Sequence, residues 1–349
     1  MIYKNIVRPV LFRFDAEKIH DFTIKMLSYG ISDNLIKPFY RYENDKLITK
    51  AGRLTFRNPI GLAAGMDKDC VALSAWDTFG FGFAEIGTVT PLPQEGNPKP
   101  RMFRYPDERA VINRLGFNNH GADSFNKNVH AGKDDVSPDF IIGINIGKNK
   151  RTPLEEAYQD YKFCFEKLFE YADYFTINVS SPNTEGLREL QQKKYLDEIL
   201  KSLQELNVEL DKIYPGGQKD IYLKIAPDLT ENEIDDIIEV TIDNKLTGII
   251  ATNTTINHEM LPADKHFKTG GLSGRPLKNL ANSVIKFIKD KSGDKLVVIG
   301  CGGVFNADDV KEKMDLGASL VQLYTSLIFE GPGVVKKIKK GLVKKTKWE

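Results

Sequence analysis

The chain has 349 residues, more than a typical single domain but within the range of one large α/β barrel with additions. Its 49 Lys and Arg residues nearly balance 48 Asp and Glu, for a net charge of +1, which argues against a dedicated nucleic-acid-binding protein. Apolar residues reach 41%, enough for a large core, whereas the three cysteines (Cys70, Cys164 and Cys301) are too few and scattered for a disulfide framework or a zinc site.

Residues 1–41 precede the first predicted barrel strand and have helical patterns. Asp15 is placed to cap a helix, and Ser32 or Asp33 can cap a shorter helix that follows. The first of these helices carries an apolar stripe made of Ile19, Phe22, Met26 and Leu27. This segment predicts either a helical cap on the main domain or an apolar surface that enters a membrane interface. No apolar run reaches the roughly 18 residues of a spanning helix, and the first residues lack a secretory-signal pattern, so we expect a reducing compartment.

Over the rest of the chain, short β-branched or aromatic runs alternate with helix-like segments such as Leu154–Tyr171 and Glu231–Ile242. The predicted strands are Ile60–Ala64, Phe83–Val89, Phe140–Ile146, Tyr174–Val179, Ile221–Ile225, Thr247–Thr252, Leu296–Gly300 and Leu320–Leu323. Several are almost wholly apolar, as expected for parallel strands covered on both faces. Eight such units predict a (β/α)8 TIM barrel, with the chemistry on the loops after the strands. The alternative, an open doubly wound sheet, would gather polar residues at one switch point, whereas here they follow all eight strands.

Several segments after these strands suit a flat, polar ligand. In the turn Gly61–Lys68, small residues let a ligand approach the backbone, and Lys68 adds a cation. The long segment Pro91–Asn118 predicts a lid or a wall of the active site. Carboxamides suit the edge of a heterocycle, and five lie near strand ends or in this segment: Asn113, Asn145, Asn178, Asn183 and Asn253. Lys224, at the end of a strand, can form a Schiff base or stabilise negative charge on a cofactor.

Two glycine-rich segments, Gly271–Gly274 and Ile299–Val304, follow predicted strands six and seven, and Leu323–Ser326, with Tyr324 and Thr325, follows strand eight. In a TIM barrel the loops after strands seven and eight often bind phosphate through backbone N–H groups, and Gly302 and Gly303 would allow that approach. No GxGxxG fingerprint follows the first strand, so a Rossmann-type dinucleotide site is disfavoured.

The run NVSSPN, from Asn178 to Asn183, presents Ser180 or Ser181 directly after a predicted strand, and Pro182 makes that loop sharp. The histidines are scattered and GxSxG is absent, which argues against an acyl-transferring serine. A serine with no base beside it would have to accept a proton from a carbon that is already acidic.

Ten motifs resemble, in order and spacing, the membrane-associated, quinone-dependent (class 2) dihydroorotate dehydrogenases, over about residues 9–335. They are GLAAGMDK, GTVTPLPQEGNPKPRMFR, NRLGFNN, GINIGKNK, NVSSPNTEGLR, KIAPD, ATNTT, GGLSGRPL, GCGGV and LVQLYTS. The resemblance implies oxidation of (S)-dihydroorotate to orotate in de novo pyrimidine (UMP) biosynthesis. It also implies flavin mononucleotide (FMN) as the hydride acceptor and a membrane quinone, ubiquinone or menaquinone, as the final electron acceptor.

The resemblance assigns roles to particular residues. Ser181 is the expected base at C5 of the substrate, while the hydride passes from C6 to flavin N5. The cytosolic class 1 enzymes use a cysteine as base, and here Cys164 lies 17 residues upstream of Ser181. The expected substrate contacts are Lys68, Asn113, Arg114, Leu115, Gly116, Phe117, Asn178, Asn183, Asn253 and Thr254. The expected FMN contacts are Ala64, Gly65, Met66, Asp67, Lys68, Thr88, Asn145, Asn178, Lys224, Thr252, Gly274, Gly303, Tyr324 and Thr325.

In class 2 enzymes an N-terminal helical extension forms a quinone tunnel, so the resemblance assigns residues 1–41 to that extension and residues 42–349 to the FMN-binding catalytic barrel. The tunnel contacts would be His20, Arg104 and Tyr324. The implied protein is a monomer without metal or nucleic acid, attached by its N-terminal helices to the cytoplasmic face of the cell membrane. Three alternatives stay open: a cytosolic-class flavin barrel that reduces fumarate or feeds a partner subunit, a Schiff-base aldolase that uses Lys224, and a binding barrel without catalysis.

Overall fold

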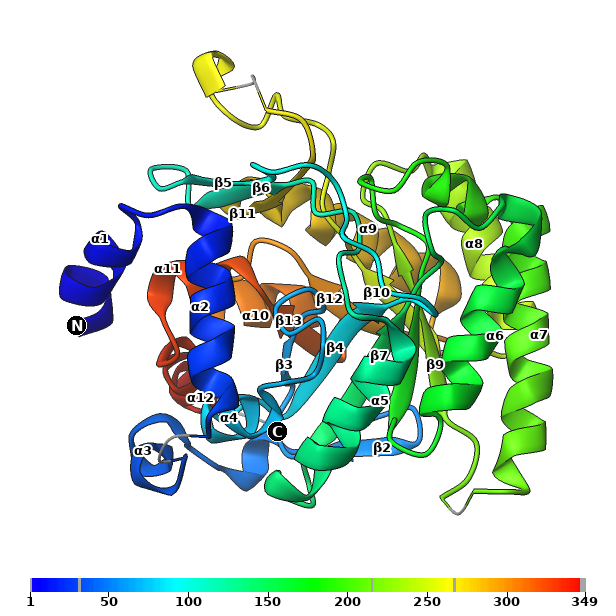
Figure 1. The fold of residues 1–349 in the computed structure, drawn as a ribbon, viewed down its shortest axis with the longest axis horizontal. Coiled ribbons are helices and arrows are strands. Elements are labelled where there is room, and N and C mark those ends of the chain that lie inside the picture. The colour runs from blue at the N-terminus through cyan, green and yellow to red at the C-terminus, as the bar shows by residue number, and fades with distance from the viewer. Residues whose placement is uncertain (1, 31–32, 215, 266–267, 346–349) are drawn as a thin grey trace.

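A closed barrel of eight parallel strands forms the centre of the computed structural model, which describes residues 2–30, 33–214, 216–265 and 268–345 (Figure 1). Around the barrel the strands run β10-β12-β13-β3-β4-β7-β8-β9. Their bounds are β3 Ile60–Leu62, β4 Phe83–Val89, β7 Ile141–Ile146, β8 Tyr174–Asn178, β9 Asp220–Ile225, β10 Gly248–Ala251, β12 Val297–Cys301 and β13 Leu320–Leu323. All eight predicted strands are present within two residues of their expected ends, and the predicted (β/α)8 barrel is confirmed.

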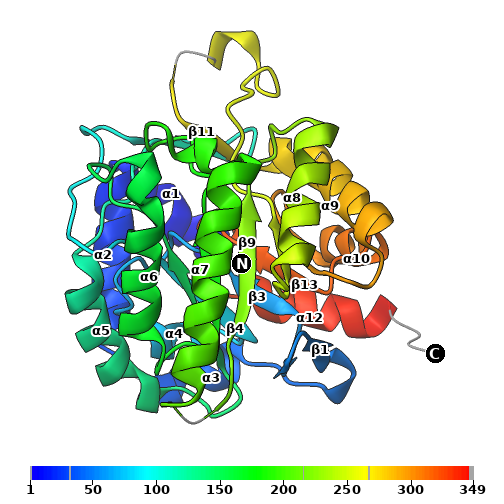
Figure 2. The same cartoon turned by 90° about the vertical axis from the view of Figure 1, so that its right-hand side faces the viewer.

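Helices cover the outside of the barrel, as Figure 2 shows for α6, α7 and α8. They are α4 Leu73–Thr78, α5 Gly121–Gly132, α6 Ala157–Leu168, α7 Lys193–Asp211, α8 Glu231–Asp243, α9 Lys278–Ser292, α10 Ala307–Asp315, α11 Thr325–Glu330 and α12 Val334–Lys345. Short 3-10 turns are η2 Asp45–Leu47, η3 Lys133–Asp135, η4 Leu154–Glu156, η5 Leu187–Gln191, η6 Ala263–Lys265 and η7 Arg275–Leu277. The helix α8 begins at a capping box, in which Thr230 and Glu233 satisfy each other's backbone N–H groups.

The N-terminal segment is helical, as predicted, and comprises η1 Tyr3–Val7, α1 Arg8–Leu11, α2 Ala16–Ser28 and α3 Asp33–Tyr40. The Asp15 side chain caps α2 by accepting a hydrogen bond from the Lys18 N–H at 3.0 Å. Of the two predicted caps for the next helix, Ser32 lies outside the described residues, and Asp33 is the first residue of α3. In Figure 1 these helices lie on the side of the barrel that carries α11 and α12.

A second, three-stranded antiparallel sheet lies beside the barrel mouth and has the order β11-β6-β5 (Figure 1). Its strands are β5 Met102–Tyr105, β6 Ala110–Asn113 and β11 Gly271–Gly274. The segment expected to be a lid or wall therefore contains a β-hairpin, and the glycine-rich GLSG segment is a strand, not a turn. At the opposite end, β1 Thr49–Ala51 and β2 Leu54–Phe56 form a separate hairpin.

Large side chains fill the barrel below its mouth. Phe83, Tyr174 and Leu320 stand at the starts of their strands and are fully buried, together with Phe56 and Tyr222. Phe83 packs edge-to-face on Phe56, with ring centroids 5.1 Å apart. Because this apolar plug closes the barrel from below, the polar side chains at the other ends of the strands can face a cavity.

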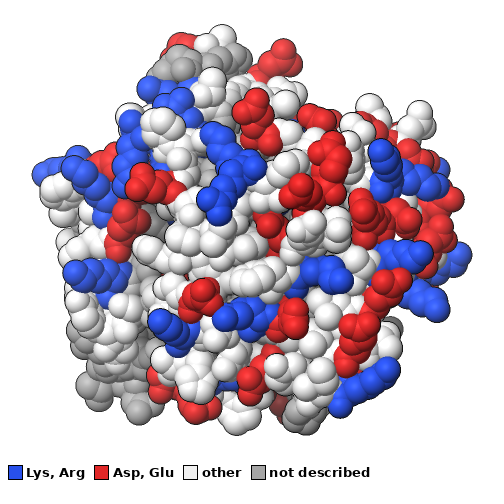
Figure 3. Space-filling model, turned by 45° about the vertical axis from the view of Figure 1, so that its right-hand side comes forward, with Lys and Arg blue, Asp and Glu red and all other residues white. Residues whose placement is uncertain are grey.

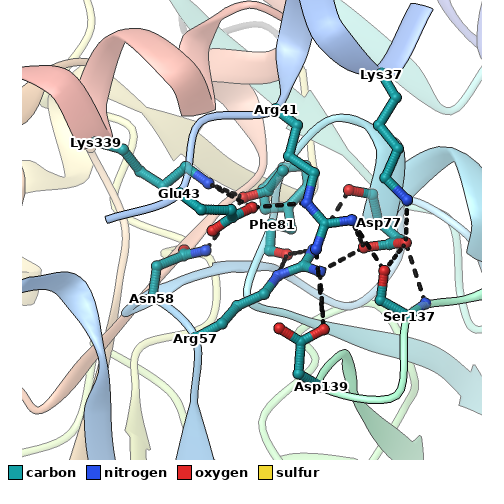
Figure 4. Close-up of polar contacts among 11 residues, drawn as sticks. Lys37, Arg41, Glu43, Arg57, Asn58, Asp77, Phe81, Ser137, Asp139 and Lys339 are labelled. Atoms are coloured by element: carbon teal, nitrogen blue, oxygen red, sulfur yellow. Dashed lines mark hydrogen bonds and ion pairs between the residues drawn. The ribbon is translucent and has the colours of Figure 1, made fainter. Parts of the chain in front are cut away.

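Two ionic clusters attach the N-terminal helices to the barrel. Near the strand starts, Asp77 binds Arg57 at 2.6 Å and lies 3.6 Å from Arg41, which follows α3 (Figure 4). Near the mouth, Glu17 of α2 is buried and accepts hydrogen bonds from the Arg101 guanidinium at 2.7–3.1 Å. Removal of either partner of such a buried pair would leave a charge without compensation, so α2 and the segment that follows α3 are held against the barrel.

Charges of both signs are interspersed over the face shown in Figure 3, in keeping with the near-zero net charge. No large area of that face carries basic side chains alone, which agrees with the absence of a nucleic-acid-binding charge pattern.

Candidate active site

The barrel mouth encloses a cavity of about 1000 Å³, part of which is open to solvent. Loops from every quarter of the barrel contribute to it, as expected when the carboxyl ends of parallel strands meet at one edge. Most of the predicted substrate and cofactor residues line this cavity: Ala64, Gly65, Lys68, Thr88, Asn113, Leu115, Gly116, Phe117, Asn178, Asn183, Lys224, Thr252, Asn253, Thr254, Gly274, Gly303, Tyr324 and Thr325. Ser181 lines it as well.

Four predicted residues lie behind the cavity wall. Asn145 accepts hydrogen bonds from Thr88 (2.5 Å) and Asn178 (3.1 Å), and so fixes two residues that line the cavity. Asp67 is buried beside Met66 and accepts hydrogen bonds from the Val71 and Ala72 N–H groups and the Trp76 indole at 2.9–3.0 Å. It thereby holds the turn that carries Lys68. The Arg114 side chain points elsewhere, toward the Pro100 carbonyl (2.9 Å) and the Thr269 hydroxyl (3.0 Å).

A buried ion pair forms the floor of the cavity. Lys224 lies at the end of β9, and its Nζ donates to the Glu85 carboxylate of β4 at 2.9 Å. Glu85 is 0% exposed and also accepts hydrogen bonds from Gln322 (2.6 Å) and Asn145 (2.7 Å). Burial alone would lower the pKa of Lys224, but the Glu85 carboxylate outweighs it and raises that pKa, so Lys224 stays charged. Sequence analysis missed Glu85, whose signal is a single charge inside the otherwise uncharged run Phe83–Val89.

The structure distinguishes the two adjacent serines after β8. Ser180 is fully buried, and its hydroxyl donates to Asn178 Oδ1 (3.0 Å) and accepts from Asn253 Nδ2 (2.9 Å). Ser181 instead faces the cavity, where its Oγ accepts a weak hydrogen bond from the Asn183 N–H at 3.3 Å. Within the described ranges no imidazole or carboxylate is hydrogen-bonded to Ser181, so its hydroxyl has no fixed general base.

The other end of the cavity is made of backbone that only glycine can supply. Gly303 has φ +72°, and a Cβ there would come within 2.8 Å of the Lys278 backbone nitrogen. Gly274 and Gly302 also have positive φ, of +98° and +112°. The side-chain oxygens of Ser326 and of Gln322, which reaches the cavity from the floor, are also buried without a partner among the described residues. Unsatisfied buried oxygens beside bare backbone are typical of a site that is completed by a polar ligand.

Of the three predicted tunnel residues, His20 belongs to α2, Arg104 contacts the N-terminal segment and Tyr324 lies on the cavity wall. Tyr324 lines the cavity, and burial raises its pKa to about 12. Arg104 of β5 donates to the Leu11 and Phe14 carbonyls between α1 and α2 and stacks 4.5 Å above the Phe12 ring. Burial, assisted by the Lys68 charge, lowers the pKa of His20 to about 3, so its imidazole is neutral. These contacts place the inner face of the extension next to the cavity wall.

A closed parallel barrel with one large, polar-lined cavity at the carboxyl ends of its strands defines an enzyme of the TIM-barrel class. The sequence profile of the family described as "Dihydroorotate dehydrogenase" matches residues 46–346. The chain belongs to this family.

Individual relatives match over nearly the whole chain. A dihydroorotate dehydrogenase (quinone) of Christiangramia forsetii is 45% identical over 348 residues, 99% of each chain. A protein of the same name from Vibrio parahaemolyticus is 46% identical and covers 98% of this chain and 100% of its own. Among solved structures, the dihydroorotate dehydrogenase of Eimeria tenella in complex with ferulenol has a TM-score of 0.86 and 35% identity, and covers 95% of this chain and 91% of its own.

Proposed function

We propose that this chain oxidises (S)-dihydroorotate to orotate in pyrimidine biosynthesis, with FMN as hydride acceptor and a membrane quinone, ubiquinone or menaquinone, as final electron acceptor. Membership of the family, at 45% identity to a quinone-type relative over nearly its whole length, supports the reaction. The observation that carries the assignment of roles is one cavity with Ser181 on its wall and the Lys224–Glu85 pair on its floor.

The chemistry of the cavity lining suits a flavin mononucleotide. Its glycine-rich end would hold the phosphate through backbone N–H groups at Gly274 and Gly303, with Thr325 beside them. The unpartnered Gln322 oxygen can accept a hydrogen bond from a ring N–H, and Lys224 provides positive charge. FMN, when bound, supplies the hydride acceptor. The further contacts would be Ala64, Gly65, Met66, Asp67, Lys68, Thr88, Asn145, Asn178, Thr252 and Tyr324.

The amide side chains of the mouth would hold the substrate. Asn113 and Asn183 are hydrogen-bonded to each other at 3.3 Å, and Asn178 and Asn253 face the same cavity. Together they offer several N–H donors and C=O acceptors, which match the alternating groups of a pyrimidine ring and its carboxylate. Lys68 adds a cation, and Thr254 and the backbone of residues 114–117 complete the contact surface.

Ser181 would accept the proton from C5 of dihydroorotate. A serine hydroxyl is a weak base, so orientation and stabilisation of the developing negative charge must contribute much of the rate. The adjacent Thr184 has a buried hydroxyl without a partner among the described residues, and a water there could carry the proton onward along Phe117. The Lys224 ammonium would stabilise negative charge on the reduced acceptor.

Residues 1–41 would form the quinone-access and membrane-attachment domain, and residues 42–349 the catalytic barrel, with His20, Arg104 and Tyr324 along the quinone path. The support is a set of exposed large apolar side chains on the extension: Ile2, Ile6, Val7, Val10, Phe14, Phe22, Met26, Tyr29 and Phe39. No helix in the described part of the chain is long and apolar enough to span a bilayer. The exposed apolar side chains suit attachment of the protein to one leaflet of a membrane. We assign this attachment to the cytoplasmic face and propose that the protein is a monomer.

Spectroscopy of the purified protein tests the reaction. We expect a yellow protein whose flavin absorption is bleached by dihydroorotate without oxygen and restored by a short-chain quinone. Ser181→Ala should slow the bleaching by orders of magnitude while orotate still binds, and near-normal bleaching would remove Ser181 from its role. A colourless protein that borohydride traps with a carbonyl substrate would instead favour a Lys224 Schiff base.

A vesicle assay tests the membrane surface. Replacing both exposed phenylalanines, Phe14 and Phe22, by Asp removes two apolar rings from the proposed membrane-binding surface. The double variant should therefore bind lipid vesicles less and turn over a long-chain quinone more slowly. Phe163→Asp is the matched control, since Phe163 is 47% exposed on α6, on the barrel's flank. Equal retention of the double variant and the control would contradict the proposed attachment.

A further inference from the structure

Arg188 lies in η5, outside the cavity, and its planar guanidinium joins three loops of the barrel mouth. Its Nε donates to the Ser180 carbonyl at 3.2 Å, in the loop after β8. Its Nη2 donates to the Thr254 carbonyl at 3.1 Å, in the loop after β10. Its Nη1 forms an ion pair of 2.9 Å with Asp228, in the loop after β9. These partners are 8, 66 and 40 residues away in the sequence, so the contact is a tertiary clamp.

The two clamped carbonyls belong to Ser180, next to the proposed base, and to Thr254, a proposed substrate contact. Ser180 immediately precedes Ser181, so the position of its carbonyl fixes the peptide plane from which the Ser181 hydroxyl projects. Thr254 is itself on the cavity wall. Asn253 strengthens this link from the inside, because its Nδ2 donates to the Ser180 hydroxyl at 2.9 Å.

Asp228 ties the third loop to the same group. Beyond its pair with Arg188, its carboxylate accepts hydrogen bonds from the Thr255 hydroxyl and from the Ile256 N–H. Arg188 and Asp228 are only about one-fifth exposed. An ion pair that is partly shielded from water, and whose other donors and acceptors are hydrogen-bonded to the backbone, stabilises the fold more than an exposed ion pair does.

We infer that Arg188 is a positioning residue for proton abstraction: it sets the distance and angle of the Ser181 hydroxyl relative to a substrate held by Asn253 and Thr254. The inference rests on the proposed function. Arg188 does not itself line the cavity, so its effect passes through the loops it holds. Only an arginine has the planar fork that reaches three oxygens at once, and a lysine could keep the ion pair with Asp228 but not both carbonyls.

The test compares the two half-reactions in the holoenzyme. Flavin bleaching by dihydroorotate is measured without oxygen, and flavin reoxidation by a short-chain quinone is measured separately. We expect Arg188→Gln to slow bleaching by about 100-fold, the typical cost of misplacing a reacting group by about 1 Å. Reoxidation should stay within about twofold of wild type, because electron transfer to quinone does not use Ser181. Arg188→Lys should fall between Arg188→Gln and wild type.

Arg53→Gln is the matched control, because Arg53 also donates to a backbone carbonyl, that of Gln218 at 2.9 Å, but at the opposite end of the barrel. It should leave both half-reactions unchanged. Hydrogen exchange gives a readout that is independent of activity: amides of residues 180–187 and 254–257 should exchange faster in Arg188→Gln than in Arg53→Gln.

The outcomes separate the inference from the proposed function. If dihydroorotate does not bleach the wild-type protein, the proposed function itself fails. If wild type is bleached and Arg188→Gln is bleached at the same rate, or both half-reactions slow equally, the positioning role is wrong. Should Arg188→Gln not fold, Arg188→Lys decides: slower bleaching with normal reoxidation supports the clamp, and wild-type bleaching overturns it.

Discussion

Glu85→Gln tests the buried ion pair below the proposed flavin site. The substitution keeps the size of the side chain but leaves the Lys224 ammonium, which is 4% exposed, beside an uncharged amide. Three donors converge on the Glu85 carboxylate, from Lys224 at 2.9 Å, Gln322 at 2.6 Å and Asn145 at 2.7 Å. A glutamine has one acceptor oxygen and an NH₂ group, so at least one donor would meet another donor.

Loss of one partner from a buried ion pair typically costs about 3–5 kcal/mol. Against a total stability of about 5–15 kcal/mol for a folded protein, this is a large fraction. The substitution also removes the carboxylate that offsets the effect of burial on Lys224, so the pKa of Lys224 should fall and its charge should weaken. We therefore expect a lower free energy of unfolding, and a reduction potential of the bound flavin that differs from that of wild type because the charges beside it have changed.

A double-mutant cycle with Lys224→Met separates the pair from its surroundings. The free energy of unfolding is measured from urea denaturation of wild type, the two single variants and the double variant. The double variant should lose less stability than the two single losses added together, because it contains no unpaired charge. Strict additivity, or a wild-type flavin potential in Glu85→Gln, would refute the view that Glu85 keeps Lys224 charged.

Three further predictions concern other parts of the molecule. Folding lowers the pKa of His20 from 6.5 to about 3, so below pH 6.5 the unfolded chain binds a proton there that the folded chain does not. The free energy of unfolding should therefore fall as the pH drops from 6.5 toward 3, by at most about 1.4 kcal/mol per pH unit. His20→Gln should unfold less steeply with acid over that window, and an unchanged pH profile would contradict this. Asp77→Asn removes the carboxylate that lies 2.6 Å from the buried Arg57 guanidinium, and should lower the free energy of unfolding by about 3–5 kcal/mol in urea or thermal unfolding. A Cβ at Gly303, where φ is +72°, would lie 2.5 Å from the Lys278 Cα, so Gly303→Ala should lower the FMN affinity measured by fluorescence; wild-type affinity would show that this turn does not hold the phosphate.

The barrel strands could be predicted because a parallel strand covered on both faces must be almost continuously apolar. The run Phe83–Val89 and the strand Tyr174–Asn178 have this pattern, and all of their residues are buried. The hairpin of β5 and β6 could not be predicted in the same way. Its strands have four residues each, and β5 is only half-buried, so its sequence differs little from that of an irregular loop.

The residues that line the candidate site could be predicted better than the buried polar residues that contact them from behind. The asparagines and glycines of the mouth follow recognisable strand ends, and family motifs name them directly. Glu85 and Gln322, by contrast, bond across 237 residues, and their meeting depends on how the strands align when the barrel closes. No local pattern contains that alignment, because a shift of one residue would turn the same side chain to the opposite face of the strand.

The pair Ser180 and Ser181 shows the same limit at the proposed catalytic position. Either serine satisfies the local pattern, since both follow β8 and precede Pro182. What separates them is Asn253, 73 residues from Ser180, whose amide binds the first hydroxyl and leaves the second facing the cavity. The proposed role of Ser181 therefore depends on its neighbours in space: the Ser180 hydroxyl is hydrogen-bonded within the loop, and the Ser181 hydroxyl faces the cavity. In the proposed arrangement the clamp at Arg188 acts on the same loop from outside, so the Ser181 hydroxyl would be positioned from both sides, and among the described residues no general base is hydrogen-bonded to it.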